Sequence, residues 1–194
     1  ALLWLWLPFW AAGMLTAGLI VLMAFLVQFF RHPARDSNPA TGELLSPADG
    51  KVVVKEIVYE PEYLQQQCLQ VSVFMGPFDV HVNRVPADGK LAYYQYHPGR
   101  YLAAYNPKSS ALNEQNAIGW QTQHGTILLR QIAGVMARRI RFYLQEGQPA
   151  RQGEQLGFIK FGSRTDILLP VKTQLQVEVG QQVYAGKTVL GTWP

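Results

Sequence analysis

The hydrophobic pattern divides the chain into two unequal parts. Residues 1–30 contain no Asp, Glu, Lys or Arg, and the stretch from Phe9 to Phe30 is almost entirely Leu, Ala, Phe, Val, Met and Gly. About 20 apolar residues are enough for a helix to cross a bilayer. The pattern therefore predicts a transmembrane anchor over residues 1–30. It is either one helix or, if residues 1–7 end an earlier span and the chain turns near Pro8, a helical hairpin.

After this apolar stretch the chain changes to short runs of β-branched and aromatic residues, separated by Gly, Pro and Asp-Gly. Such runs are typical of strands, and nothing beyond residue 30 shows a long helical period. The predicted strands are Val52–Val58, Leu69–Met75, Lys90–Tyr96, Thr126–Ile132, Ala137–Leu144 and Thr165–Leu169. One or two short helices are expected between Pro98 and Asn116.

The fold class predicted from these runs is mainly β. Residues 31–45, rich in Pro, Asn, Ser and Gly, are expected to form a juxtamembrane linker, and residues 46–194 a compact β domain. The sequence PADGK occurs twice, at residues 47–51 and 86–90, each time before a predicted strand. Residues 169–193 resemble half of a lipoyl/biotinyl-type barrel sandwich. They place no lysine at an exposed hairpin tip, so we interpret this similarity as architectural.

The distribution of charge indicates where the domain lies. Arg31, His32 and Arg35 directly follow the apolar stretch, and positive charge flanking a span is typical of the cytoplasmic side. Cys68 has no second cysteine with which to form a disulfide, which suits a reducing compartment. The net charge of +4 fits a protein lying against an anionic leaflet. We expect a cell-membrane protein with its domain on the cytoplasmic face, and no nucleic-acid partner, because no dense Lys/Arg run is present.

Three polar segments carry residue types that catalysis uses. A serine hydroxyl becomes nucleophilic when a base takes its proton, and a carboxylate assists that base. Asp49, His81 and Ser163 supply these three types. Each also has an ordinary structural interpretation: a turn for Asp49, a packed strand for His81, and a turn or bulge for Gly162-Ser163. The segments are SPADGK (46–51), FMGPFDVHVNRVPADG (74–89) and FGSRTD (161–166).

Together these segments resemble the phosphatidylserine decarboxylase family, in its short membrane-anchored form from bacteria and archaea. Any one matching stretch is weak, but they cover nearly the whole chain in the expected order. They are FFRHPAR, SPADGKV, FMGPFDVHVNRVPADG, the loop Asn113–Asn116, GTILLRQIAGVMARRI and GEQLGFIKFGSRTDILLP.

The resemblance implies a pyruvoyl enzyme that cuts its own chain between Gly162 and Ser163. A large chain would end at Gly162, and a small chain, residues 163–194, would begin with a pyruvoyl group made from Ser163. The two chains would form a heterodimer, with a higher oligomer left open. The covalent pyruvoyl group, with no metal, would form a Schiff base with the amine of phosphatidylserine or a related serine lipid and release CO2.

The resemblance also implies roles for individual residues. Asp49 and His81 would activate Ser163 for cleavage, and His81 would return a proton to the substrate carbon. Arg164 and Arg84 would bind the substrate phosphodiester, because guanidinium groups suit phosphate. Asn113 would shape the mouth of the site.

One position departs from the longer bacterial members, which carry a second His three residues after His81. Here that residue is Arg84. Either His81 serves both reactions, or His97 or His124 takes the place of the second His.

Two other functions remain open at this point. A membrane-tethered adaptor with a lipoyl-like module explains the anchor and the C-terminal pattern, but gives no role to the segments around His81 and Ser163. A pyruvoyl decarboxylase of a soluble amino acid would leave the membrane span without a purpose.

Overall fold

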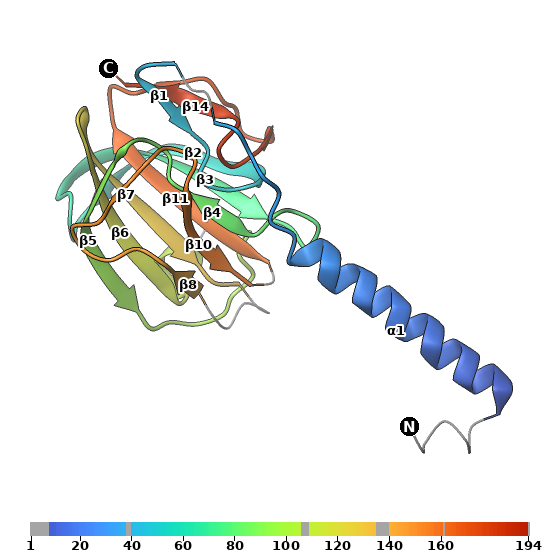
Figure 1. Ribbon diagram of the computed structural model, residues 1–194. Helices are drawn as coiled ribbons and strands as arrows, with labels where there is room; N and C mark the ends of the chain where they lie inside the picture. Colours follow the sequence, from blue (N-terminus) through green and yellow to red (C-terminus); the bar gives the residue numbers. More distant parts are fainter. Residues whose placement is uncertain (1–7, 38–39, 106–108, 135–139, 161, 194) are drawn as a thin grey trace.

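One long helix, α1 (Phe9–Phe29), projects from a domain built of strands (Figure 1). The computed structural model describes residues 8–37, 40–105, 109–134, 140–160 and 162–193. By length and composition α1 is able to cross a membrane, and its apolar window is not buried against the domain. The predicted apolar helix is confirmed. Residues 1–7, on which the hairpin alternative depends, lie outside the described residues.

The domain is mainly β, as predicted. Its strands are β1 (Glu43–Leu45), β2 (Gly50–Glu60), β3 (Gln66–Met75), β4 (Val82–Arg84), β5 (Gly89–His97), β6 (Gln115–Thr122), β7 (Gly125–Ile132), β8 (Ile140–Phe142), β9 (Pro149–Ala150), β10 (Gln155–Ile159), β11 (Ser163–Pro170), β12 (Gln174–Leu175), β13 (Gln182–Val183) and β14 (Val189–Thr192). A single-turn helix, α2 (Ser109–Leu112), lies between β5 and β6.

The strands form three sheets in the described part of the chain. The largest has the order β13-β2-β3-β11-β7-β6-β5-β9, and the two small sheets have the orders β1-β14-β12 and β4-β10-β8. All of the pairings are antiparallel. The apolar core contains Trp120, Leu129 and Ile167 together with other buried residues of the large sheet.

The strand order reveals an internal repeat. Read from its two ends, the strand order of the large sheet matches β13 with β9, β2 with β5, β3 with β6 and β11 with β7. The two small sheets match in the same way, since β1, β14 and β12 correspond to β4, β10 and β8. Repeat A therefore consists of β1–β3 and β11–β14, and repeat B consists of β4–β10. Repeat B is inserted between β3 and β11 of repeat A, whereas its own β6 and β7 are joined by a tight hairpin.

Each repeat donates a backbone hydrogen bond to the proline of the other repeat's PADGK segment. Leu45 N–H donates to Pro86 O and Arg84 N–H donates to Pro47 O, each at 2.9 Å. Each donor lies two residues before the proline of its own copy. In both copies the glycine begins the next strand, β2 or β5. The repeated sequence therefore joins the two halves at their centre.

Several boundaries differ from the predictions. Strand β6 lies partly where the sequence favoured helix or gave no assignment, and α2 accounts for only four residues of that stretch. Ala117 is buried in one apolar cluster, while Ile118 and Trp120 are buried in another. A strand covered on both faces has no simple alternation of apolar and polar residues. The predicted strand Ala137–Leu144 is shorter, since β8 covers Ile140–Phe142 and residues 137–139 lie outside the described part.

Candidate active site

His81 lies beside the peptide bond that the sequence analysis singled out. Its Nε2 is 3.3 Å from the Gly162 amide nitrogen, and its Nδ1 is 2.9 Å from the Asp79 carbonyl oxygen. The carbonyl can only accept a hydrogen bond, so Nδ1 carries the proton, and Nε2 is left to accept one from the Gly162 N–H. Burial lowers the pKa of His81 from its ordinary value of 6.5. At neutral pH the ring is therefore an uncharged base with its lone pair at Gly162.

The membrane-type helix contributes directly to the surroundings of His81. The Phe29 ring, on the last turn of α1, lies 4.3 Å from the imidazole ring between centroids, and Phe29 is fully buried. Phe158 of β10 lies 6.4 Å from His81 on the same side of the structure. Figure 1 shows the end of α1 meeting the domain next to the start of β11. The apolar rings explain why His81 is buried and neutral.

Ser163 begins β11 and is fully buried. Its Oγ lies 3.3 Å from the Met75 sulfur, a weak acceptor. Gly162, the preceding residue, has a φ of +64°, in the left-handed region that glycine adopts at little cost. The turn into β11 therefore depends on glycine, and it leaves the serine hydroxyl without a strong hydrogen-bond acceptor.

The Gly162 carbonyl is packed closely against Gly134, which follows β7. A β-carbon placed on Gly134 would overlap the Gly162 oxygen and would lie 3.0 Å from the Gly162 carbonyl carbon. The chain before Gly134 is fixed, because Ala133 N–H donates to Glu114 O at 2.9 Å and Asn113 Nδ2 donates to Ala133 O at 2.7 Å. Only a residue without a side chain fits against this carbonyl.

Asn113 holds two segments together rather than facing open space. It is buried, and its side-chain amide both donates to Leu102 O, at 2.8 Å, and accepts from Leu102 N–H, at 2.9 Å. With the bond to Ala133 O, this accounts for both ends of the amide. Asn113, which was predicted to shape the mouth of the site, joins the segments at Leu102 and Ala133.

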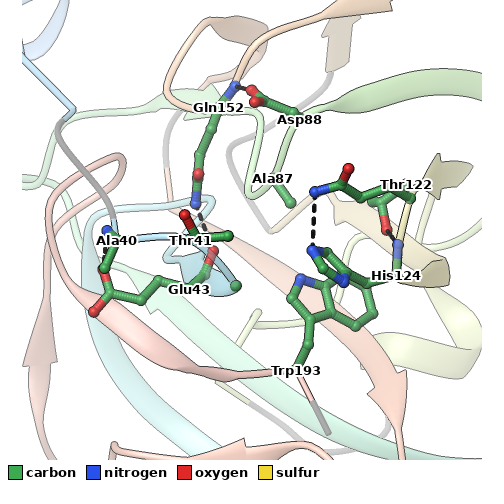
Figure 2. Close-up of a pocket in the computed structure, with 11 residues that line it drawn as sticks. Ala40, Thr41, Glu43, Ala87, Asp88, Thr122, His124, Gln152 and Trp193 are labelled. Carbon is green, nitrogen blue, oxygen red and sulfur yellow. Dashed lines mark hydrogen bonds between the residues drawn. The ribbon is translucent and has the colours of Figure 1, made fainter.

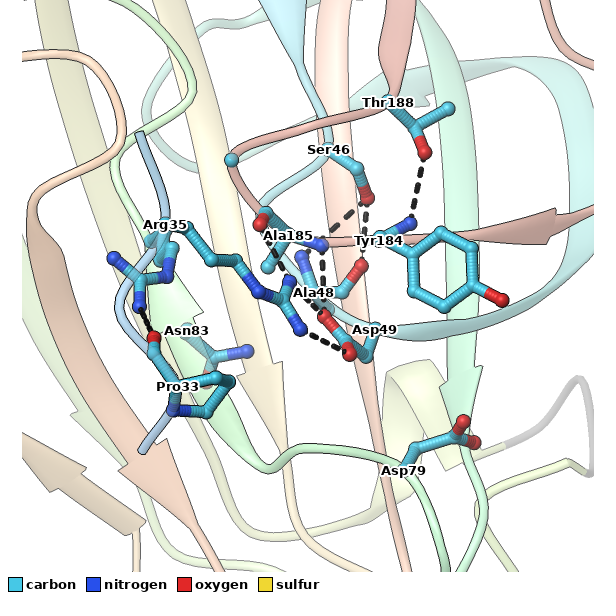
Figure 3. Close-up of polar contacts among 12 residues, drawn as sticks. Pro33, Arg35, Ser46, Ala48, Asp49, Asp79, Asn83, Tyr184, Ala185 and Thr188 are labelled. Atoms are coloured by element: carbon cyan, nitrogen blue, oxygen red, sulfur yellow. Dashed lines mark hydrogen bonds and ion pairs between the residues drawn. The ribbon is translucent and has the colours of Figure 1, made fainter. Parts of the chain in front are cut away.

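Asp49 is paired with Arg35 and not with His81 (Figure 3). The two guanidinium nitrogens of Arg35 lie 2.5 and 2.6 Å from the Asp49 carboxylate oxygens, and Ala185 N–H donates to Asp49 at 2.8 Å. No hydrogen bond joins Asp49 to His81 in the described structure. Asp49 still raises the pKa of His81 through its charge, although burial is the largest influence and outweighs it.

The two arginines proposed as substrate ligands are both buried and both engaged. Arg84 donates to Gly153 O at 2.8 Å and to Pro33 O at 2.9 Å, which ties the linker after α1 to the turn before β10. Arg164 donates to Asp166 at 2.6 Å and to Ser72 Oγ at 2.7 Å. Its Nη1 is buried without a partner. Since side chains alternate along β11, Arg164 lies on the face opposite to Ser163.

Comparison with known proteins identifies the family. The sequence profile described as phosphatidylserine decarboxylase matches residues 22–191. The chain belongs to this family. A relative from Amoebophilus asiaticus, named phosphatidylserine decarboxylase proenzyme, is 48% identical over 86% of this chain and 74% of its own length. Relatives of the same name from Cytophaga hutchinsonii and Burkholderia vietnamiensis are 46% and 42% identical, over 90% and 94% of this chain and 81% of their own lengths.

The protein is therefore a decarboxylase with an N-terminal helix suited to membrane association. This result bears on the residues considered as replacements for the second family His. His97 ends β5, which is separated from β11 by β6 and β7, with neighbouring strands about 4.8 Å apart. It contacts Glu62 at 3.2 Å. His124 lies in the hairpin between β6 and β7 and stacks on Trp193. Of the three histidines, the structure brings His81 to the Gly162–Ser163 bond.

A polar pocket at the end of the domain away from α1 corresponds, in the other repeat, to the candidate site around His81 and Ser163 (Figure 2). It has a volume of about 220 Å³ and is lined by Asp88, His124 and Gln152, among others. Asp88 accepts a hydrogen bond from Gln152 N–H at 2.7 Å, just as Asp49 accepts from Ala185 N–H. Gly42 precedes β1 as His81 precedes β4, so this pocket has a glycine at the position that corresponds to His81.

Asp88, which occupies in the other repeat the position of Asp49, clarifies the role of Asp49. Asp88 accepts the same kind of backbone hydrogen bond where the other repeat has no counterpart of His81, so this bond holds a turn in both repeats. What distinguishes Asp49 from Asp88 is its ion pair with Arg35. Among the described residues, no group of three His, Cys, Asp or Glu side chains is arranged to hold a metal ion.

Sequence reasoning missed three residues that pack around the candidate site: Met75, Gly134 and Phe29. The serine hydroxyl meets Met75 because Ser163 and Met75 are paired across β11 and β3. Gly134 stands in GTILLRQIAGVMARRI, which was noted only for its family resemblance. Phe29 was assigned to the membrane span. Each lies far from Ser163 in sequence, and no local pattern connects them.

Proposed function

We propose that the protein is a phosphatidylserine decarboxylase made as a precursor that cuts itself between Gly162 and Ser163. One observation carries this proposal. The neutral Nε2 of His81 lies 3.3 Å from the amide nitrogen of Gly162, directly before a buried serine. The relatives' name, proenzyme, agrees with processing of the chain.

The cleavage follows from the groups present. Ser163 Oγ attacks the Gly162 carbonyl carbon while its proton passes to His81. His81 then returns this proton to the peptide nitrogen as the adduct collapses, and the C–N bond breaks to leave an ester and a free amine. Removal of the Ser163 α-proton then expels the Gly162 carboxylate and leaves dehydroalanine. After tautomerisation to the imine, one water molecule is consumed and ammonia is released, which converts residue 163 to a pyruvoyl group.

The site fits such a group at this position. The residue is buried between β3 and β7, so it would stay in place as the first residue of a new chain. A pyruvoyl group at this position would supply a carbonyl able to take the substrate amine and an electron sink for the pair left by CO2. His81, in its protonated form, would return a proton to the substrate carbon.

We propose positioning roles for the other predicted residues. Asp49 fixes Arg35 and the turn at Ala185. Arg84 fastens the linker after α1, and Asn113 fixes the chain before Gly134. Arg164 orders β11 through its ion pair with Asp166. Because their polar groups are largely used within the protein, the residues that bind the substrate's anionic group are to be sought elsewhere.

The same proposal covers the assembly and its location. The large chain would comprise the anchor, the linker and residues 46–162, and the small chain residues 163–194, joined as a heterodimer. With Arg31 and His32 at the end of α1, the domain would lie on the cytoplasmic face of the cell membrane. The substrate would be phosphatidylserine or a related serine lipid, and the product the corresponding ethanolamine lipid.

The decisive variant is Ser163→Ala. The wild-type chain is expected to separate into two fragments on denaturing electrophoresis, with mass spectrometry assigning a carbonyl-bearing N-terminus to the fragment beginning at residue 163. Ser163→Ala is expected to stay in one piece and to release no CO2 from phosphatidylserine, because it lacks the nucleophile.

A matched control is Ser37→Ala, which removes a hydroxyl that bonds to Gly186 O at 2.8 Å in the linker. This variant should still be cut. If the wild-type chain stays intact and Ser163 is unmodified while the protein releases CO2, the proposed cofactor is wrong.

A further inference from the structure

A groove runs along the domain from the end of α1. It has a volume of about 380 Å³ and opens to the surface. Its lining combines three basic residues with three aromatic ones: His32, Arg141, Lys160, Phe30, Tyr143 and Phe158. None of the residues that line it is Asp or Glu. The surface of this groove, which we call the cationic groove, is thus positive over an aromatic floor.

The two strongest cations of the groove have no acidic partner among the described residues. Arg141, on β8, is exposed and takes part in no described ion pair. Lys160 follows β10, and its ammonium lies 6.0 Å from the centre of the Phe30 ring. This contrasts with Arg35, Arg130 and Arg164, each of which is paired with a carboxylate. The cations in the groove are therefore available to an external anion.

The groove connects the membrane helix with the reacting bond. Phe30 follows α1 directly, and its ring stacks on Phe158 at 5.7 Å between centroids. Phe158 lies 6.4 Å from the His81 ring. Lys160 precedes Ser163 by three residues, which is at most about 10 Å of extended chain. An anion bound by Lys160 would therefore lie close to the Gly162–Ser163 bond. It would also lie near Phe30, where α1 ends and the chain would leave the membrane.

We propose that the cationic groove binds the phosphodiester of the serine phospholipid that is decarboxylated, with Lys160 and Arg141 as its ligands. This rests on the proposed function. The lipid phosphate stays charged throughout the reaction and suits a fixed cation. The substrate carboxylate must lose its charge as CO2 leaves, so a cation held on it would stabilise the ground state and slow the reaction.

The surface of α1 supports a lipid rather than a soluble phosphate ester. An apolar hollow lies between α1 and Phe78, lined by Val21, Leu22 and Phe25 among others. Phe78 is 71% exposed. Acyl chains lying along α1 would occupy this side while the head group turns into the groove. Serine phosphate without acyl chains would gain nothing from it.

The test uses the full, self-cleaved enzyme in detergent with short-chain phosphatidylserine below its critical micelle concentration. Lys160→Gln and Arg141→Gln are each expected to raise KM about tenfold, equivalent to about 1.4 kcal/mol of binding, with a smaller change in kcat. Arg141→Lys, which keeps the charge, should recover much of the loss. Free L-serine carries no phosphate, so borohydride reduction of its Schiff base should trap as much serine on the groove variants as on the wild type.

Charge-matched controls are Lys172→Gln, in the turn at the far end of β11, and Arg151→Gln, in the turn before β10. Both should leave KM as in the wild type. The proposal is overturned if the groove variants keep a wild-type KM with the monomeric lipid. It is also overturned if their defect appears only on anionic vesicles, because general attraction to the bilayer would then explain it.

Failure of this proposal is distinguishable from failure of the proposed function. A wild-type protein that neither cleaves itself nor releases CO2 contradicts the function. An active, cleaved wild type with unaffected groove variants contradicts only the groove. Lys160 is near the scissile bond, so if Lys160→Gln does not cleave, Arg141→Gln, on a different strand, carries the test.

Discussion

Gly134 is the residue on which the geometry of the scissile carbonyl most directly depends. A β-carbon there would overlap the Gly162 oxygen and would lie 3.3 Å from the Ala104 side chain, so either the carbonyl or the loop must move. We expect Gly134→Ala to slow self-cleavage at least tenfold. The measurement is the fraction of cut chain against time on denaturing gels of freshly made protein.

The matched control for Gly134→Ala is Gly191→Ala. A β-carbon on Gly191 would also press on a backbone carbonyl, that of Gln174, but between β14 and β12 and away from the site. If both variants were cut equally slowly, the effect would be one on folding in general. Rapid cleavage of Gly134→Ala with a folded spectrum would show that the carbonyl tolerates the displacement.

His81 gives self-cleavage a pH dependence of known sign. Burial lowers its pKa from 6.5, so the neutral base persists to a lower pH than that of an exposed histidine. The cleavage rate is expected to be level above about pH 6.5 and to fall only below it. The same buried ring favours the folded state above the unfolded pKa, and that advantage is lost as the pH falls from 6.5 toward the folded pKa.

The pH profile is measured by following cleavage of the purified precursor after a jump in pH. An inflection above 6.5 would contradict a burial-dominated histidine. His81→Gln should remove the inflection along with most of the rate, since an amide cannot take the serine proton.

Among individual residues, the sequence singled out Ser163 and His81 as candidates but not the residues that pack around them. Ser163 and His81 were recognisable because their residue types and segments carry the chemistry. The pairing of Asp49 with Arg35 was not foreseen, because a carboxylate in a turn has no preferred distant partner until the linker folds back. Gly134 was missed because only three-dimensional packing shows that its missing side chain leaves room for the Gly162 carbonyl.

Among the elements, β11 determines whether the small chain would stay bound after the proposed cleavage. It lies inside the large sheet, with eight residues paired with β3 and five with β7. Its Ile167 and Leu169 are buried in the main core. Breaking the bond before Ser163 removes none of these interactions. We therefore expect the two chains to stay together.

The expected result is a single peak on size-exclusion chromatography in mild detergent that yields both chains on a denaturing gel. They should separate only when the domain unfolds. Loss of the small chain without denaturant would contradict the placement of β11 between two strands of the large chain.

The predictability of the elements followed their composition. The predicted runs within β2, β3, β5, β7 and β11 were found because they are rich in β-branched and aromatic residues and are bounded by turn residues. β6 was missed because its sequence, QNAIGWQT, contains a glycine and mostly residues that are neither β-branched nor aromatic. The span of α1 was the easiest element to predict, since composition alone sets it.

For the whole molecule, the repeat explains why the proposed cleavage site would occur in one copy and not in the other. In repeat B, β6 runs into β7 through a tight hairpin, whereas in repeat A the corresponding strands, β3 and β11, are separated by the whole of repeat B. The chain entering β11 is thus free to adopt the turn at Gly162. The doubled PADGK hinted at this duplication in the sequence. The inserted arrangement became visible only from the order of the strands.

The contact between Phe29 and His81 fixes the height of the reacting groups above the bilayer when α1 spans it. An enzyme held in this way meets its lipid by lateral diffusion within one leaflet, and product leaves by the same route. The quantity that governs its rate is then the mole fraction of serine lipid in that leaflet, so diluting the surface with neutral lipid slows turnover even when the bulk lipid concentration is unchanged.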